Sequence, residues 1–161
     1  MKVCKFEKIK DEDEMKQVIN CIQKEHPYVA VVPILAQLQE WLQAISISWF
    51  HEEDEVSHTT VNAIEAYCYA LANHLITDSH LNQEIKNRIL ECIKKIHILV
   101  EDKADLLIDK MIKAEIYGLS SDLFTYCLRQ QGLRAQTLDT GKLIQINLER
   151  KPDIPYIQES I

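Results

Sequence analysis

Glycine is scarce in this sequence. Only three of the 161 residues are glycine, and only four are proline. No stretch rich in these residues could serve as a linker, and the chain has no internal repeat or low-complexity segment. We therefore expect residues 1–161 to form a single domain.

Positive charge is in the minority. Lys and Arg number 18 against 25 Asp and Glu, which gives a net charge of −7 at pH 7. Attraction to phosphate dominates the binding of nucleic acids. An acidic chain without a basic stripe is therefore not expected to bind them.

Long apolar runs are also missing. No run approaches the roughly 20 residues that cross a membrane, and the amino terminus, with Glu7 and Asp11, does not resemble a signal peptide. The five cysteines are odd in number and lie far apart: Cys4, Cys21, Cys68, Cys92 and Cys127. We expect no membrane association and a cytoplasmic location with reduced thiols, not a disulfide framework or a zinc site.

Strand-forming residues occur in four short stretches. Residues 2–6 contain Val3 and Phe6, and residues 28–32 form a continuous apolar run typical of a strand in a parallel sheet. Between them, the acidic residues 11–14 begin a helix with one apolar face. This order predicts a right-handed strand–helix–strand unit. Two further strands are predicted at residues 133–138 and 143–148.

Helical periodicity dominates the middle of the chain. After a polar break at residues 51–55, apolar residues recur at helical spacing over 61–75 and again over 81–99. A shorter helix is predicted near 107–111, and Ser120-Ser121-Asp122 is interpreted as the cap of another. The predicted fold is a three-layer α/β/α domain. It has a small, mostly parallel sheet of about four strands and a protruding helical insertion at about residues 56–113.

Several local strings resemble the amino-terminal half of aspartokinases, in the amino-acid kinase family. Those enzymes open with a strand reading Lys-Phe-Gly-Gly-Thr-Ser, continue with Val-Val-Ser-Ala after the second strand, and later carry Gly-Glu-x-x-Ser. The matching strings here are Lys5-Phe6-Glu7-Lys8-Ile9-Lys10, Val31-Val32-Pro33-Ile34, Ile116-Tyr117-Gly118-Leu119-Ser120, and the gapless stretch through residues 119–128, 131–135 and 138–139. The resemblance implies an amino-acid kinase-like amino-terminal lobe. In the family, this lobe takes part in transferring the γ-phosphoryl group of ATP to the aspartate carboxylate with Mg²⁺.

The departures from the family pattern concern its functional residues. Glu7 and Lys8 replace two glycines that let backbone N–H groups approach phosphate closely. Pro33-Ile34 lacks the hydroxyl of the Ser-Ala segment, and Tyr117 replaces the substrate-binding glutamate. Lys5 is the remaining match to a substrate-binding residue. The family's nucleotide-binding half is expected beyond the point where this sequence stops.

These departures favour a non-catalytic remnant of an aspartokinase, without a cofactor, that acts through protein–protein association. A homodimer or a complex with another protein is expected. One alternative is an aspartokinase half that needs a separate nucleotide-binding lobe. Another is a helical adaptor unrelated to the family.

Other residues with reactive or ligating side chains have simpler interpretations. Residues 51–58 are rich in metal-ligating types but fit no known spacing, so a solvated acidic loop is predicted. His74 and His80 are expected at the surface, Cys68, Cys92 and Cys127 in the core, Ser120 as a helix cap and Asp139 in a turn. Trp41, Trp49 and Phe50 are predicted in the core, with a partner contact as the alternative. The pair Trp49-Phe50 and the strand 143–148 are the candidate surfaces of a dimer.

Overall fold

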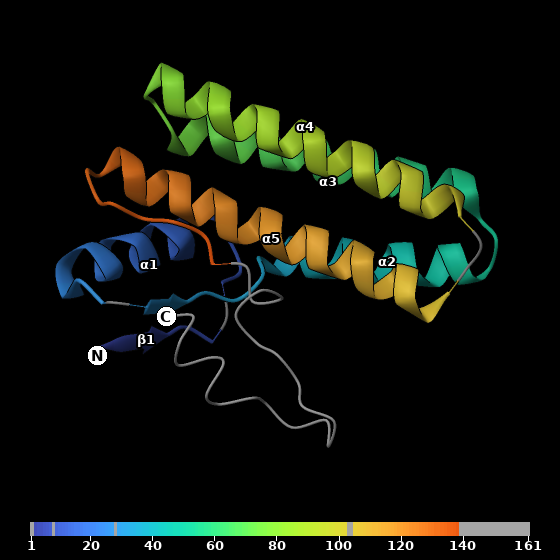
Figure 1. The fold of residues 1–161 in the computed structure, drawn as a ribbon, viewed down its shortest axis with the longest axis horizontal. Coiled ribbons are helices and arrows are strands. Elements are labelled where there is room, and N and C mark those ends of the chain that lie inside the picture. The colour runs from blue at the N-terminus through green and yellow to red at the C-terminus, as the bar shows by residue number, and fades with distance from the viewer. Residues whose placement is uncertain (1, 8, 28, 103–104, 139–161) are drawn as a thin grey trace.

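A computed structural model describes residues 2–7, 9–27, 29–102 and 105–138 of the protein. The elements follow in the order β1 (Val3–Lys5), α1 (Glu12–Glu25), β2 (Val29–Val31), α2 (Ala36–Phe50), α3 (Asp54–Leu75), α4 (Ser79–Glu101) and α5 (Leu106–Gln130). The described chain is therefore mostly helical, with one small sheet (Figure 1).

The first three elements form the expected strand–helix–strand unit. Strands β1 and β2 are parallel, with Val3 opposite Val29 and Lys5 opposite Val31. Helix α1, which connects them, begins at Asp11, whose carboxylate accepts a hydrogen bond of 2.9 Å from the N–H of Glu14. This cap and the acidic first turn explain why the helix begins at this point. Val3 and Val31 are about half exposed, so one face of the described sheet is uncovered.

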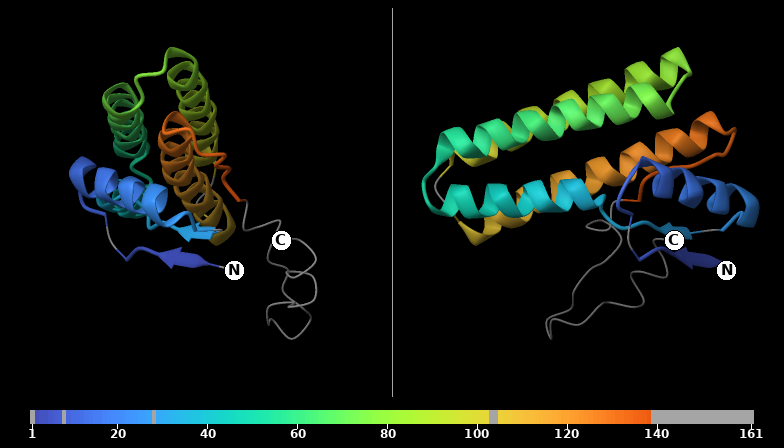
Figure 2. Two further views of the ribbon diagram at one scale, coloured as in Figure 1. Left: turned by 90° about the vertical axis from the view of Figure 1, so that its left-hand side faces the viewer. Right: turned by 180° about the vertical axis from the view of Figure 1, so that it is seen from behind.

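Helices α2 to α5 form an antiparallel four-helix bundle. Contacts near both ends fix the direction of α2 against α5: the N–H of Leu35 donates to Oγ of Ser120, and Oγ of Ser46 donates to the carboxylate of Asp109. Because each helix reverses the chain, the α2–α3 and α4–α5 connections lie at one end of the bundle. The α3–α4 connection and the strand–helix–strand unit lie at the other (Figures 1 and 2).

A single cluster of buried side chains connects the helices. Its residues recur at helical spacing on each helix, for example Ile85, Ile89, Ile93 and Ile96 of α4. Trp49 of α2 is only 2% exposed, and its ring N–H donates to the backbone carbonyl of Asp102 at 3.3 Å. Burial of this apolar surface is the main stabilising contribution. Among the described residues, no buried side-chain nitrogen or oxygen lacks a hydrogen-bond partner.

The end of the bundle that carries the α3–α4 connection is closed by one side chain of α5. The amide of Gln130 donates to the carbonyl of Leu75 at 2.8 Å and accepts from the N–H groups of Thr77 and Asp78. Asn82 adds two bonds of 2.9 Å to the carbonyls of Ala72 and Ile76. The bonds of Gln130 attach the α3–α4 turn to α5, and those of Asn82 attach the end of α3 to the first turn of α4.

The prediction of a three-layer α/β/α fold was wrong. Over the described residues the sheet contains only the two three-residue strands, and the helices pack mainly on one another. Residues 133–138 are not a strand, because they follow α5 without pairing to β1 or β2. The predicted strand at 143–148 lies outside the described residues.

The predicted break inside α5 was also wrong. Residues near 107–111 and those after Ser120 belong to the one helix Leu106–Gln130. Buried Ile112, Ile116, Leu119 and Leu123 continue the apolar stripe across the expected boundary, so nothing terminates the helix there. The helix predicted over 81–99 is confirmed within α4. Gly132 follows the end of α5 with φ of 80°, a left-handed conformation that suits glycine.

Candidate functional site

A groove of about 1080 Å³ opens beside the carboxyl end of β2. Its walls come from the β2–α2 connection, from α4, from α5 and from the segment after α5. The lining residues are Val32, Pro33, Ile34, Arg88, Cys92, Lys95, Ala114, Glu115, Tyr117, Gly118, Leu119, Ser121, Asp122, Thr137 and Leu138. Ligands of parallel α/β units commonly bind beyond the carboxyl ends of the strands. This groove is therefore the first candidate binding site.

Three positions singled out by the resemblance to aspartokinases line this groove together. Pro33 and Ile34 lie on one side, and Tyr117 of α5 lies on another, more than 80 residues along the chain. The matching lysine lies elsewhere: Lys5 is exposed at the end of β1 and is not among the lining residues. Lys8 and Asp139 fall outside the described residues.

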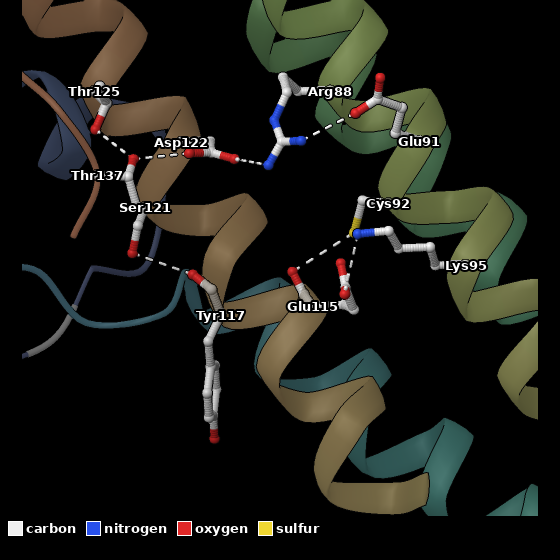
Figure 3. Close-up of polar contacts among 10 residues, drawn as sticks. All are labelled: Arg88, Glu91, Cys92, Lys95, Glu115, Tyr117, Ser121, Asp122, Thr125 and Thr137. Carbon is white, nitrogen blue, oxygen red and sulfur yellow. Dashed lines mark hydrogen bonds and ion pairs between the residues drawn. The ribbon is translucent and has the colours of Figure 1, made fainter. Parts of the chain in front are cut away.

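The charged side chains of the groove bind one another. Arg88 of α4 contacts Glu91 at 3.0 Å and Asp122 of α5 at 3.3 Å, and Lys95 contacts Glu115 at 3.4 Å (Figure 3). Asp122 also accepts a hydrogen bond of 2.7 Å from Thr137. These pairs connect α4 to α5 and neutralise the lining, so the groove presents no strong field to an anion or a cation.

The hydroxyl and thiol groups of the groove are also held by the protein. Ser121 donates to the carbonyl of Tyr117 at 3.1 Å, and Ser120, a buried neighbour within α5, accepts from Leu35 instead of capping a helix. Burial raises the pKa of Cys92 to about 12, so it stays a thiol and donates to the carbonyl of Glu115 at 3.5 Å. Among the described lining residues, none forms a nucleophile–base pair.

The ring of Tyr117 points away from these polar contacts (Figure 3) and is 45% exposed. The resemblance noted in the sequence aligns Tyr117 with a substrate-binding glutamate, and tyrosine supplies no carboxylate at this position. The described lining combines apolar walls with saturated polar pairs. Such a groove can accommodate part of a ligand but supplies no activated catalytic group.

The structure also shows the positions of the remaining candidate residues from the sequence analysis. His74 and His80 are exposed and lie 3.4 Å from Glu12 and Glu84 respectively, as expected for surface histidines. Cys68, Cys92 and Cys127 are buried, as predicted, and burial raises the pKa of all three thiols. Within the described ranges, no group of three His, Cys, Asp or Glu side chains is arranged to hold a metal ion.

A second candidate site lies at the far end of the bundle and was missed by the sequence analysis. We call it the acidic end. Its acidic residues are Glu52, Glu53, Asp54, Glu55, Glu101, Asp102 and Asp105, and all seven are exposed. Within the described part of the chain, no Lys or Arg forms an ion pair with them. The sequence showed the acidic stretch 52–55, but only the antiparallel bundle brings Glu101, Asp102 and Asp105 to the same end of the fold.

Apolar side chains are exposed around the same end. Phe50 is 50% exposed in the last turn of α2, and Leu106 and Leu107 are more exposed in the first turn of α5. Seven of the twelve large exposed apolar side chains in the described structure lie on the helix segments next to this end, namely Ile47, Phe50, Val56, Ile98, Leu106, Leu107 and Met111. The acidic end therefore exposes both apolar side chains and seven carboxylates, and we call these carboxylates its acidic rim.

The aromatic residues divide between the core and this surface. Trp49 is a core residue, so it is unavailable as the partner anchor considered in the sequence analysis, whereas Phe50 is partly exposed. Trp41 packs edge-on against Tyr67, with ring centroids 5.4 Å apart.

The protein is thus a helical bundle with an appended strand–helix–strand unit, and it carries two candidate sites. Comparison with protein-family models, with curated proteins and with solved structures found no match to this chain. Among the described helices, none combines the length and apolar character needed to traverse a lipid bilayer.

Proposed function

We propose that this chain is a non-catalytic protein-binding module whose acidic end receives a cationic, amphipathic segment of another protein. The observation that carries the proposal is that exposed apolar side chains and the exposed carboxylates of the acidic rim lie at the same end of the bundle. Large exposed apolar patches with polar rims commonly mark interaction sites. The reduced state expected for the five cysteines fits a cytoplasmic setting for this function.

The arrangement of charge supports a cationic partner. Glu101 and Asp102 lie at the carboxyl end of α4, where the helix dipole is already negative, so they lower the stability of the helix. The acids of residues 52–55 lie at the same end, and exposed charges interact over a Debye length of roughly 8–10 Å at physiological salt. The rim therefore produces a negative potential that favours Lys and Arg.

The same charges make this surface unsuitable for a symmetric dimer. In a two-fold dimer, the same patch of each copy meets its equivalent, so the two acidic rims would face each other. Like charges placed opposite one another across an interface are costly. Hence a different protein, not a second copy, is proposed at the acidic end.

Binding of a model peptide tests this proposal. The probe is a helical peptide of about 18 residues with Leu on one face and Lys on the other, and isothermal titration calorimetry measures its affinity. A Kd of roughly 1–50 μM that weakens with salt is expected. A Glu/Leu peptide of the same pattern is the negative control.

Matched variants locate the binding surface. The triple variant Glu52→Gln, Glu53→Gln, Glu55→Gln is expected to weaken binding at least tenfold. The control Asp13→Asn, Glu84→Gln, Glu91→Gln removes the same charge elsewhere and is expected to change binding less than threefold. Phe50→Ser should weaken binding, whereas Val31→Ser, at a similarly exposed valine of the sheet, should not. Equal effects of both triple variants, or no binding of the Lys/Leu peptide, would refute the proposal.

An ancestry shared with aspartokinases remains part of the proposal. It is supported by positions 33, 34 and 117, which the resemblance aligns with site residues of the family and which line one groove, although the residues themselves differ. The second candidate function is therefore an aspartokinase half that completes its site with a separate nucleotide-binding lobe. Aspartate binding to the isolated chain, measured by calorimetry, would favour this candidate over the protein-binding module.

A further inference from the structure

Two histidines meet between α3 and α4. The Nδ1 atoms of His58 and His97 lie 2.7 Å apart, and the two rings are stacked with their centroids separated by 5.0 Å. Both side chains are partly buried. Neither the groove nor the acidic end uses this contact.

The neighbouring amide determines where the protons lie. Nε2–H of His97 donates to the side-chain oxygen of Asn62 at 3.2 Å, one helical turn after His58 on α3. A neutral imidazole carries one proton, so Nδ1 of His97 is then unprotonated and acts as an acceptor. The short contact therefore requires that Nδ1–H of His58 donates to Nδ1 of His97.

The hydrogen bonds from His58 to His97 and from His97 to Asn62 stay intact when one further proton binds, but not when two bind. The first can occupy Nε2 of His58, which leaves the bond between the rings intact and makes its donor charged. The second must occupy Nδ1 of His97, where it removes the acceptor and places two imidazolium rings in contact.

We propose that His58 and His97 form a pH-sensitive latch between α3 and α4, closed while His97 is neutral and opened by the second proton. The latch lies about one helical turn from the acidic end, on both helices. It does not depend on the proposed protein-binding function.

The surroundings of the two histidines include causes that lower the pKa of His97 and causes that raise it. Burial is the main cause that lowers the pKa of His97, and the neighbouring His58 lowers it further, while Glu65 of α3 and Glu101 of α4 oppose the shift. Of the elements packed against the pair's helices, α2 carries only Glu40, which contacts Gln37 near the far end of that helix. The α5 carboxylates that face α4, Glu115 and Asp122, are bound by Lys95 and Arg88.

The lowered pKa of His97 determines how the stability of the protein depends on pH. A histidine whose pKa is lowered by folding is protonated more readily in the unfolded chain. Its contribution to stability is therefore complete above the ordinary histidine pKa of about 6.5 and is lost as the pH falls below that value. Acidification should loosen the contact between α3 and α4.

Nuclear magnetic resonance of the imidazole nitrogens tests the latch directly. At pH 7.5, His97 is expected as the Nε2–H tautomer, and its titration midpoint should lie below that of an ordinary histidine. In His58→Phe, which keeps a stacked ring but removes the donor and the charge, the midpoint of His97 should rise by at least about 0.5 pH units. The control His74→Gln, at an exposed histidine, should leave it unchanged.

Amide hydrogen exchange measures the opening itself. In the wild type, protection of residues 58–62 and 94–101 is expected to fall at least tenfold relative to residues 112–128 between pH 7 and 4.5. An Nδ1–H tautomer of His97 at pH 7.5, or the same midpoint in wild type and His58→Phe, would overturn the proposal. A uniform change of protection across the bundle would also overturn it. The tautomer and exchange measurements need no variant, so a variant that fails to fold leaves the proposal testable.

Discussion

Shortening Ile89 of α4 to alanine tests whether this helix is held by its buried stripe. Ile89 and Ile96 are fully buried, whereas Ile98 of the same helix is 64% exposed. The change removes three carbon groups, each worth about 0.8 kcal/mol of transfer free energy, which gives a lower estimate of about 2.4 kcal/mol. The cavity left behind raises the expected loss to as much as about 5 kcal/mol.

Chemical denaturation in urea measures this loss, with Ile98→Ala as the matched control. Ile89→Ala and Ile96→Ala should each lower the free energy of unfolding by roughly 2–5 kcal/mol, and the exposed control by less than about 0.5 kcal/mol. In thermal unfolding, each kcal/mol corresponds to about 2–4 °C for a chain of this size. Losses below about 0.5 kcal/mol at both buried positions, or an equal loss at Ile98, would refute this account of α4.

Three further predictions concern ligand binding, association and a buried carboxylate. In calorimetry, the isolated chain should show no saturable binding of Mg·ATP tighter than roughly 1 mM, with or without aspartate. The reason is that Glu7 and Lys8 stand at the positions that the resemblance aligns with the two glycines of the family's phosphate-binding loop. Tighter binding would contradict the non-catalytic proposal. The chain should form a homodimer through the edges of the two-stranded sheet, which have no further strand beside them among the described residues. Sedimentation equilibrium should then give twice 18.7 kDa, and a mass that stays at 18.7 kDa up to roughly 100 μM would exclude the dimer. Asp109→Asn should lower the free energy of unfolding at pH 7 by about 1–3 kcal/mol, because Asp109 accepts hydrogen bonds from Ser46 and Lys113. Burial raises the pKa of Asp109, but the hydrogen bonds from Lys113 and Ser46 lower this pKa by more, so its net shift is downward. The difference in stability between wild type and variant should therefore shrink as the pH falls below the ordinary aspartate pKa of about 3.8. A difference that does not depend on pH would contradict the stabilising role of the Asp109 carboxylate.

The helices could be predicted from the sequence because their signals are local. The Asp11 cap, the Asp78 cap, whose carboxylate accepts from Leu81, and the apolar period of residues 81–99 all depend on residues within a few turns of one another. The continuity of α5 was missed because the cap-like string at Ser120 outweighed the apolar period that passes through it. In the folded chain, Ser120 accepts a hydrogen bond from the N–H of Leu35, which directly precedes α2 and is 85 residues away in sequence.

The sheet and the acidic end could not be predicted in the same way. Residues 133–138 have strand-like composition, but a strand exists only if a neighbour supplies its hydrogen bonds, and the sequence does not specify that neighbour. The acidic end combines two loops about 50 residues apart, which meet because the bundle is antiparallel. Trp49 and Phe50 are adjacent in sequence, yet only the packing of α2 determines which of them is buried.

The hydrogen bonds of Gln130 have a consequence for how the bundle opens. They join α5 to the α3–α4 turn at several backbone groups. Near the acidic end, α2 is joined to Asp102 by the indole of Trp49 and to Asp109 of α5 by the hydroxyl of Ser46, one bond each. Local opening should therefore begin at the acidic end and progress toward Gln130. A partner bound at the acidic end would suppress that opening, so its arrival would slow amide exchange along the whole length of α4 without any change in the position of the helices.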